Sequence, residues 1–173
     1  MSQRMRKTKK LPKSVRPEEW DKLIKEVVKA KDKVALVSFL LAYGSGMRIS
    51  EVLRCRGEHF RDNKSIFIPE SKGGVERVIP SPKDWRKSFF KQLPINLSTR
   101  TLQRKFRHFS KKAKLNPLYT FHSLRHGWAT RMLEKGTPIN QVSLGLGHSN
   151  VSTTSIYVKA SPQDLLKSYE DNF

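Results

Sequence analysis

The sequence predicts a mainly α-helical domain with one small antiparallel β-sheet, an α+β fold. Apolar residues recur at three- and four-residue steps over most of the chain, which is the spacing of one helix face. Two short runs with a period of two stand on either side of Lys72, Gly73 and Gly74, as in a β-hairpin. The chain has 173 residues, 36% of them hydrophobic, so it can bury a core of its own.

The expected elements follow one another with recognisable start and stop signals. The first helix begins at Pro17, a residue that suits the first helical position. A second, more apolar helix covers residues 32–43 and ends at the break formed by Gly44, Ser45 and Gly46. The hairpin strands are expected over residues 65–69 and 75–80. Further helices are expected over residues 48–55, 82–93, 98–114, 122–135, 138–145 and 151–157, with a last one from Pro162.

The charge of the chain is strongly positive and unevenly distributed. There are 35 Lys and Arg against 15 Asp and Glu, a formal net charge of +20. Residues 1–16 hold seven basic residues and no acid, and residues 81–114 hold eleven basic residues with Asp84 as their one acid. Such a localised excess indicates a surface that binds a polyanion. Nucleic acid is favoured over an anionic membrane, because the basic stretches lack a broad apolar face with exposed Trp.

The composition also excludes several classes of protein. Cys55 is the single cysteine, which rules out an internal disulfide, a multi-cysteine zinc site and an Fe–S cluster. No apolar run approaches the ~20 residues of a membrane-spanning helix, and no signal peptide opens the chain. We therefore expect a protein of the reducing cytoplasm.

The segment 98–114 is predicted to be an amphipathic helix that begins at an N-cap, Ser98. An ordinary solvated helix face usually mixes the two signs of charge, whereas the polar face here carries no acid. This favours a helix that lies along DNA phosphates or enters the major groove. The candidate DNA-contact residues on that face are Arg100, Arg104, Arg107, Lys111 and Lys114, opposite an apolar face of Leu102, Phe106, Phe109 and Ala113.

Several other residues could carry chemistry, although each has a structural alternative. His122 and Arg125 share a helix face and could move a proton and neutralise a phosphate at one place. His122 and His126 could instead chelate zinc, but no acidic cluster nearby offers further ligands. Arg48 starts a helix, where anions are favoured, yet it could simply pair with Glu51 one turn later.

Three more candidates lie in segments whose alternatives are equally ordinary. Lys72 stands at the hairpin tip, where it could reach a phosphate or remain solvated. His148 follows a Gly-x-Gly at residues 145–147 that is a negligible dinucleotide signal. Tyr157 could be a packing residue.

The order of these motifs is more informative than any one of them. Residues 44–51 (GSGMRISE), 71–80 (SKGGVERVIP), 122–126 (HSLRH) and 146–157 (LGHSNVSTTSIY) together resemble the catalytic domain of the tyrosine recombinases, the phage integrase and Xer family. The resemblance covers residues 16–157 and is closest in style to Xer-type and archaeal integrases. The family's six catalytic positions fall on Arg48, Lys72, His122, Arg125, His148 and the nucleophile Tyr157.

The resemblance implies the tyrosine recombinase catalytic-domain fold and a site-specific recombinase or integrase. The hydroxyl of Tyr157 would attack a scissile DNA phosphate, leaving a 3′-phosphotyrosine and a free 5′-hydroxyl. Arg48 and Arg125 would contact the non-bridging oxygens, for which a guanidinium fork is well shaped. Because the bond energy is kept in the phosphotyrosine, the resemblance implies no cofactor, neither metal nor ATP.

The remaining roles also follow from the resemblance. His122 would accept the tyrosine proton, Lys72 would protonate the departing 5′-oxygen, and His148 would hydrogen-bond the phosphate. Glu51, one turn from Arg48, would orient the site. Two alternatives stay open: DNA relaxation like that of a type IB topoisomerase, and a non-catalytic DNA-binding protein on the same fold. The presence of all six residues argues against the second.

The resemblance also organises the chain. Residues 1–15 are expected to be a flexible basic arm or the remnant of an interdomain linker, and residues 16–160 the catalytic domain. The apolar stripe of the helix in residues 161–173 packs on its own domain or docks in trans on a neighbouring protomer. Family members carry a separate DNA-binding domain before the catalytic one, and only the basic arm precedes Pro17 here, so strong site recognition by this chain alone is not expected.

The implied partners are double-stranded DNA and other copies of the chain, which would be a monomer in solution and a tetramer on paired DNA sites. The implied location is the cytoplasm, at the nucleoid, in a chain of prokaryotic, viral or plasmid origin.

Overall fold

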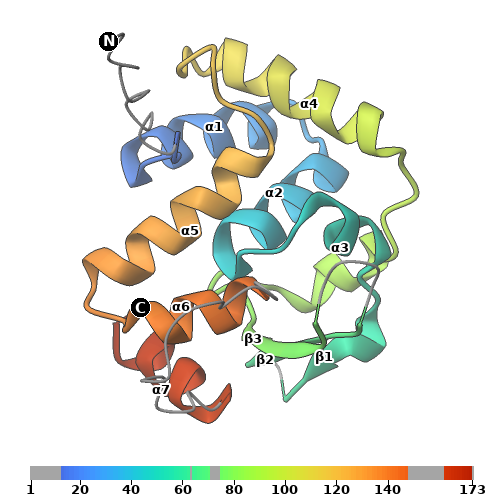
Figure 1. The fold of residues 1–173 in the computed structure, drawn as a ribbon. Helices are drawn as coiled ribbons and strands as arrows, with labels where there is room; N and C mark the ends of the chain where they lie inside the picture. Colours follow the sequence, from blue (N-terminus) through green and yellow to red (C-terminus); the bar gives the residue numbers. More distant parts are fainter. Residues whose placement is uncertain (1–12, 63, 71–74, 148–161, 173) are drawn as a thin grey trace, which may run out of the picture.

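Helix α2 (Lys33–Ser45) is the central element of the fold. The computed structural model describes residues 13–62, 64–70, 75–147 and 162–172 (Figure 1). Nearly every side chain of α2 is buried, because α1 (Pro17–Lys29), α3 (Ile49–Arg54), α4 (Thr99–Lys112) and α5 (His122–Glu134) all pack against it. This surrounding explains why its sequence is apolar on all sides instead of amphipathic.

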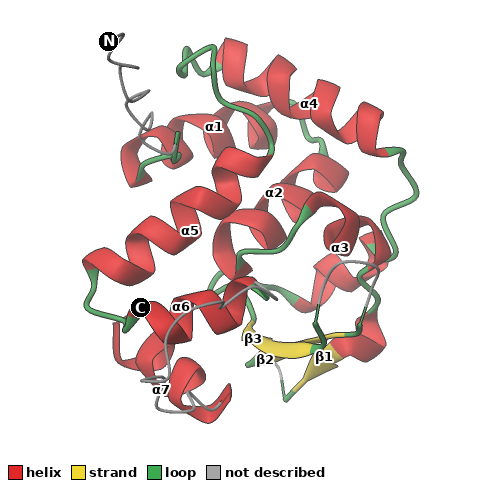
Figure 2. Ribbon diagram, viewed as in Figure 1, coloured by secondary structure: helices red, strands yellow, loops and turns green. Residues whose placement is uncertain are grey.

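A small antiparallel sheet lies at one side of these helices (Figure 2). Its strands are β1 (Phe60–Arg61), β2 (Ser65–Ile68) and β3 (Arg77–Pro80), in that order, with Ile66 paired to Ile79. The predicted hairpin is therefore confirmed, while β1 was not predicted because two residues are too few to show alternation. The hairpin tip, residues 71–74, lies outside the described residues.

Among the residues that the structure describes, two apolar clusters stabilise the domain. The larger one joins α1, α2, α4 and the sheet, and includes Phe39 with Phe106 and Phe121 packed edge-to-face on it. The smaller one joins α5, α6 (Ile139–Leu146) and α7 (Pro162–Asn172). Its buried members are Trp128, Met132, Val142 and Leu165. Helix α7 thus packs on its own domain within the single chain, and docking of α7 in trans stays a prediction.

The helix predicted over residues 82–93 is wrong. This segment contains only a 3₁₀ helix, η2 (Lys87–Gln92). Trp85 stacks on Phe60 with ring centroids 4.6 Å apart, and Phe89 and Phe90 pack edge-to-face against Trp85. These aromatic contacts hold the segment against the sheet and outweigh its helical spacing.

The other boundaries hold with small differences. Ser98 caps α4, its hydroxyl accepting from the backbone N–H of Thr101 at 3.1 Å. The helix ends at Lys112, and Lys114 has a left-handed backbone (φ 54°), so Lys114 is not on the helical face where it was predicted. The helix predicted over residues 151–157 lies outside the described residues. No helix in the part of the chain that the structure describes is long and apolar enough to span a membrane.

Candidate active site

Glu51 is the centre of a buried arginine cluster between α3, β3, α5 and α6. Its carboxylate accepts two hydrogen bonds from Arg77, NH1 to Oε1 and NH2 to Oε2, both 2.9 Å long. Arg48 donates from its backbone N–H (2.7 Å to Oε2) and from NH1 (3.2 Å to Oε1). NH1 of Arg125 lies 4.0 Å from Oε2. One carboxylate therefore faces three guanidinium groups.

The same arginines also bind the C-terminal turn of α6. Arg77 donates from Nε to the carbonyl oxygen of Gly145 (2.7 Å), Arg125 from NH2 to that of Leu146, and Arg48 from NH2 to that of Gly147 (3.0 Å). These carbonyls form the negative end of the helix dipole, which favours cations. The arginine cluster thus ties α3, β3 and α5 to the end of α6.

Close packing around Trp128 brings these elements together. Trp128 is fully buried on α5. A Cβ on Gly46, which ends α2 with φ 70°, would lie 2.6 Å from the Trp128 ring, and a Cβ on Gly145 would lie 2.7 Å from it. Only glycine permits this approach at the two positions. As a result NH1 of Arg125, one turn before Trp128, donates to the carbonyl oxygen of Gly46 at 2.8 Å.

The electrostatics of the cluster favour an additional anion. Burial raises the pKa of Glu51, but the hydrogen bonds and charge of Arg77 outweigh it, and with help from Arg48 and Arg125 they hold that pKa below its usual range. Burial, and then repulsion from Arg48, lowers the pKa of Arg125 to about 9. Arg125 therefore remains protonated at neutral pH, and among the described residues three guanidinium groups gather around the carboxylate of Glu51. The Arg125 side chain is 3% exposed, whereas that of Arg48 is 28% exposed and reaches solvent.

His122 is exposed at the first position of α5, on the helix that also carries Arg125. Its ring packs edge-to-face on His126, with centroids 4.5 Å apart. Burial, and then the charge of Arg125, lowers the pKa of His126, so the protonated form of His126 is disfavoured. Among the described residues, no three His, Cys, Asp or Glu side chains gather as metal ligands.

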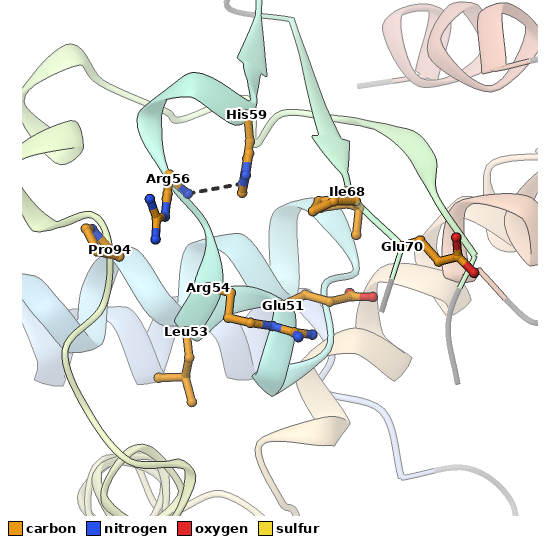
Figure 3. Close-up of a pocket in the computed structure, with 9 residues that line it drawn as sticks. Glu51, Leu53, Arg54, Arg56, His59, Ile68, Glu70 and Pro94 are labelled. Carbon is orange, nitrogen blue, oxygen red and sulfur yellow. Dashed lines mark hydrogen bonds between the residues drawn. The ribbon is translucent and has the colours of Figure 1, made fainter. Parts of the chain in front are cut away.

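A cavity of about 320 Å³ lies beside Glu51. Figure 3 shows Glu51, Arg54 and Arg56 on α3 and the turn after it, across from Ile68 and Glu70 at the end of β2. The dashed line in Figure 3 is the hydrogen bond from the Arg56 backbone N–H to Nδ1 of His59, 3.2 Å long. The cavity is thus a recess of mixed charge between the arginine cluster and the end of β2.

The structure brings together three of the predicted site residues, Arg48, Glu51 and Arg125. The pairing of Arg48 with Glu51, the structural alternative, is present, but the same carboxylate also serves two further arginines. Three other predicted residues, Lys72, His148 and Tyr157, lie outside the described residues. On α4 the predicted basic side chains are exposed and the apolar ones are buried, and the helix packs on α1, α2 and α3 away from α6 and α7 (Figure 1).

Arg77 is the member of the cluster that sequence reasoning missed. Arg77 lies on β3 two positions before Ile79, so the two side chains are on the same face of the strand, and both are buried. The available signal was the two-residue alternation along the strand, which puts Arg77 on the inward face, where an arginine requires a buried acidic partner.

Comparison with known proteins shows the family of the chain. The model described as "Phage integrase family" matches residues 13–164, and the chain belongs to the phage integrase family. Tyrosine recombinase XerA of Pyrococcus horikoshii is 35% identical, over 94% of this chain and 62% of that protein. Tyrosine recombinase XerC of Mannheimia succiniciproducens is 32% identical, over 94% and 61%. The chain thus spans about 62% of the length of the first of these relatives.

Solved structures confirm the predicted fold. The integrase of mycobacterium phage Brujita superposes with a TM-score of 0.73 at 20% identity, covering 97% of this chain and 60% of that one. The XerH recombinase in a pre-cleavage complex with difH substrate gives 0.69 at 23% identity, covering 94% and 55%. A lambda integrase tetramer bound to a Holliday junction gives 0.57 at 22% identity, covering 84% and 50%.

Proposed function

We propose that this chain is the catalytic part of a site-specific DNA recombinase that cleaves and rejoins DNA through a 3′-phosphotyrosine. The observation that carries the proposal is the buried cluster in which Arg48, Arg77 and Arg125 face the single carboxylate of Glu51. An excess of guanidinium donors held in fixed positions suits a phosphodiester, whose negative charge concentrates on its non-bridging oxygens in the transition state.

The reaction begins with attack of the Tyr157 hydroxyl on the scissile phosphorus. The bond from phosphorus to the 5′-oxygen breaks, so the phosphate stays on the 3′ side, now esterified to Tyr157, and a 5′-hydroxyl is released. Arg48 and Arg125 bind the non-bridging oxygens during this step, because a guanidinium fork fits two oxygens better than a point charge does. Glu51 keeps Arg48 in the required orientation through its two hydrogen bonds.

Proton transfers accompany both bond changes. An unperturbed tyrosine has a pKa of about 10, so a base is needed at neutral pH. His122 accepts this proton from its exposed position at the start of α5, and Lys72 donates one to the leaving 5′-oxygen. His148 hydrogen-bonds the phosphate. Because the phosphotyrosine is itself an ester, the 5′-hydroxyl of a partner duplex can reverse the step and exchange strands without metal or ATP.

Other tyrosines are poorer nucleophiles on physical grounds. Burial and a hydrogen bond to Glu19 (2.9 Å to Oε2) raise the pKa of Tyr119 to about 12. Burial also raises the pKa of Tyr43 to about 12 and that of Tyr169 above its ordinary value. A phenolate is therefore harder to form at each of these positions, which supports Tyr157 as the nucleophile.

The expected partners are double-stranded DNA and further copies of the chain. Support for DNA comes from the net charge of +20 and the acid-free exposed face of α4. The related lambda integrase has been solved as a tetramer on a Holliday junction, and we propose the same arrangement on paired sites for this chain, with a monomer in solution. Residues 1–15 would be an arm or linker, residues 16–160 the catalytic domain, and residues 161–173 a C-terminal helix that packs on its own domain or docks in trans on a neighbouring copy. The site of action would be the cytoplasm, at the nucleoid.

Covalent capture tests this function. The chain is incubated with nicked suicide duplexes of randomised sequence, and DNA that remains attached in SDS is recovered, sequenced and resynthesised. We expect an adduct with wild type and with Tyr119→Phe, and none with Tyr157→Phe. Arg48→Lys should slow adduct formation about 10²–10³-fold, the usual cost of one positioned donor. An adduct of equal yield in Tyr157→Phe would refute the assignment.

The same duplexes separate the alternatives. Cleavage that persists in EDTA supports the arginine-based mechanism, whereas loss in EDTA and recovery with zinc refutes it. Strand exchange between two duplexes distinguishes a recombinase from a relaxing enzyme, which would relax a supercoiled plasmid without exchange. Binding without any adduct would indicate a non-catalytic protein.

A further inference from the structure

We propose that Arg77 is a positioning residue of the active site, which orients Arg48 and Arg125 by fixing the Glu51 carboxylate against the C-terminal turn of α6. This inference rests on the proposed function and adds a residue to it.

The first observation is that the whole guanidinium of Arg77 is engaged within the protein. NH1 and NH2 donate to the two oxygens of Glu51, each at 2.9 Å, and Nε donates to the carbonyl oxygen of Gly145 at 2.7 Å. The side chain is 2% exposed. Its three nitrogens therefore join β3, α3 and α6. Because two of them are held by the Glu51 carboxylate, Arg77 acts on the substrate through its neighbours, whereas Arg125 donates to neutral carbonyl oxygens that a phosphate can replace.

The second observation is that Arg77 and Arg48 share both oxygens of Glu51. Oε1 accepts from Arg77 NH1 and Arg48 NH1, and Oε2 accepts from Arg77 NH2 and the Arg48 backbone N–H. A bidentate fork fixes the plane of a carboxylate as well as its position. Without Arg77 the carboxylate could turn toward Arg125, whose NH1 lies 4.0 Å away, and the orientation of Arg48 would change with it.

The third observation concerns the end of α6. Gly147 ends this helix with φ 61°, and a Cβ there would lie 2.8 Å from NH1 of Arg77. Arg77 thus packs directly on the turn whose carbonyls receive Arg48 (from Gly147) and Arg125 (from Leu146). The Arg77 guanidinium therefore contacts both structures that hold Arg48 and Arg125, the Glu51 carboxylate and the C-terminal turn of α6.

The test measures single-turnover adduct formation on the captured duplex, made with either a normal phosphate or a methylphosphonate at the scissile position. The methylphosphonate lacks one charged non-bridging oxygen, so it depends less on correctly oriented arginines. We expect Arg77→Lys and Arg77→Met to slow cleavage of the phosphate by about 10²-fold, with DNA affinity unchanged. On methylphosphonate the defect relative to wild type should be at least tenfold smaller.

Two controls separate positioning from folding. Arg131→Met removes another partly buried arginine, one that donates to the Tyr43 carbonyl and stacks on the Tyr43 ring, far from Glu51 in the chain and outside the cluster. We expect it to lower the urea midpoint without changing the cleavage rate of folded protein. Arg77→Lys serves where Arg77→Met fails to fold. The pair Arg77→Lys and Glu51→Gln, combined in one chain, should cost no more than Glu51→Gln alone, because both act through one carboxylate.

Distinct results overturn distinct statements. Wild-type rates in both Arg77 variants, equal defects on the two substrates, or independent effects of Arg77→Lys and Glu51→Gln would each overturn the positioning role while leaving the proposed function intact. Absence of an adduct with wild type would overturn the proposed function and, with it, this inference.

Discussion

Removal of the Glu51 carboxylate should destabilise the fold far more than removal of a surface acid. In Glu51→Ala the guanidinium groups of Arg77 and Arg125, with side chains 2% and 3% exposed, would remain buried without a counter-charge. Breaking a buried ion pair from one side costs about 3–5 kcal/mol. A domain of this kind is stable by about 5–15 kcal/mol, so the variant should lose a large fraction of its stability.

Urea unfolding at neutral pH, followed by far-UV circular dichroism, measures this loss. Glu134→Ala is the matched control, because Glu134 pairs with Arg16 at 2.9 Å on the surface, where such pairs contribute about 0–1 kcal/mol. The double variant Glu51→Met, Arg77→Met should recover part of the loss of Glu51→Ala, since replacing both partners by apolar groups leaves fewer unpaired charges.

The arrangement around Glu51 predicts one more response. Inorganic phosphate should raise the urea midpoint of Glu51→Ala more than that of wild type, because the anion supplies the missing charge and stabilises the folded state by mass action. If Glu51→Ala lost less than about 1 kcal/mol, as expected for Glu134→Ala, the cluster would not be a buried ionic network and the reasoning would fail.

Three further predictions follow from the structure. The pKa of Glu51 is lowered in the folded state, so its stabilising contribution is present above the unfolded pKa of about 4.5 and is lost as pH falls through the lower folded pKa. Urea midpoints measured from neutral to acid pH should therefore fall less steeply in Glu51→Gln than in wild type. Equal slopes would contradict this prediction. Replacing Arg100, Arg104 and Arg107 together by Ala should reduce the log–log salt dependence of DNA binding by about 0.9 for each lost phosphate contact, and an unchanged slope would mean that α4 faces solvent in the complex. Leu165→Ala should cost about 2–5 kcal/mol in dilute monomer, because Leu165 is fully buried on its own domain; no loss would indicate that α7 packs only in trans.

Local patterns predicted most of the secondary structure because they reflect burial. The α4 segment alternates basic and apolar residues at helical steps, and its Leu102 and Phe106 are buried as that spacing requires. The same rule failed for residues 82–93, where Trp85 and Phe89 also have helical spacing. Trp85 stacks on Phe60, which is distant in sequence, and Phe89 packs on Trp85, so local spacing could not show that aromatic packing would decide the conformation.

The site residues that belong to sequence motifs could be predicted, whereas residues that shape the site through packing could not. Arg48, Glu51 and Arg125 were found from motif order, and they meet in one cluster. In the sequence Gly145 belongs to a Gly-x-Gly pattern that is a negligible dinucleotide signal, yet in the structure it lets Trp128 approach α6 closely enough to build that cluster. Such a role depends on a neighbour remote in sequence, and a pattern of a few residues cannot contain it.

The three arginines of the cluster differ in which hydrogen-bond partners they can give up. Arg48 and Arg125 each donate to a neutral carbonyl at the end of α6, whereas Arg77 donates twice to a full negative charge. A guanidinium bound to a carboxylate also gains a charge–charge attraction that a guanidinium bound to a neutral carbonyl lacks, so a phosphate can draw donors from the carbonyls more readily than from Glu51. In the proposed reaction, Arg48 and Arg125 therefore exchange carbonyl partners for phosphate oxygens, and Arg77 keeps Glu51 and the end of α6 in place during the exchange.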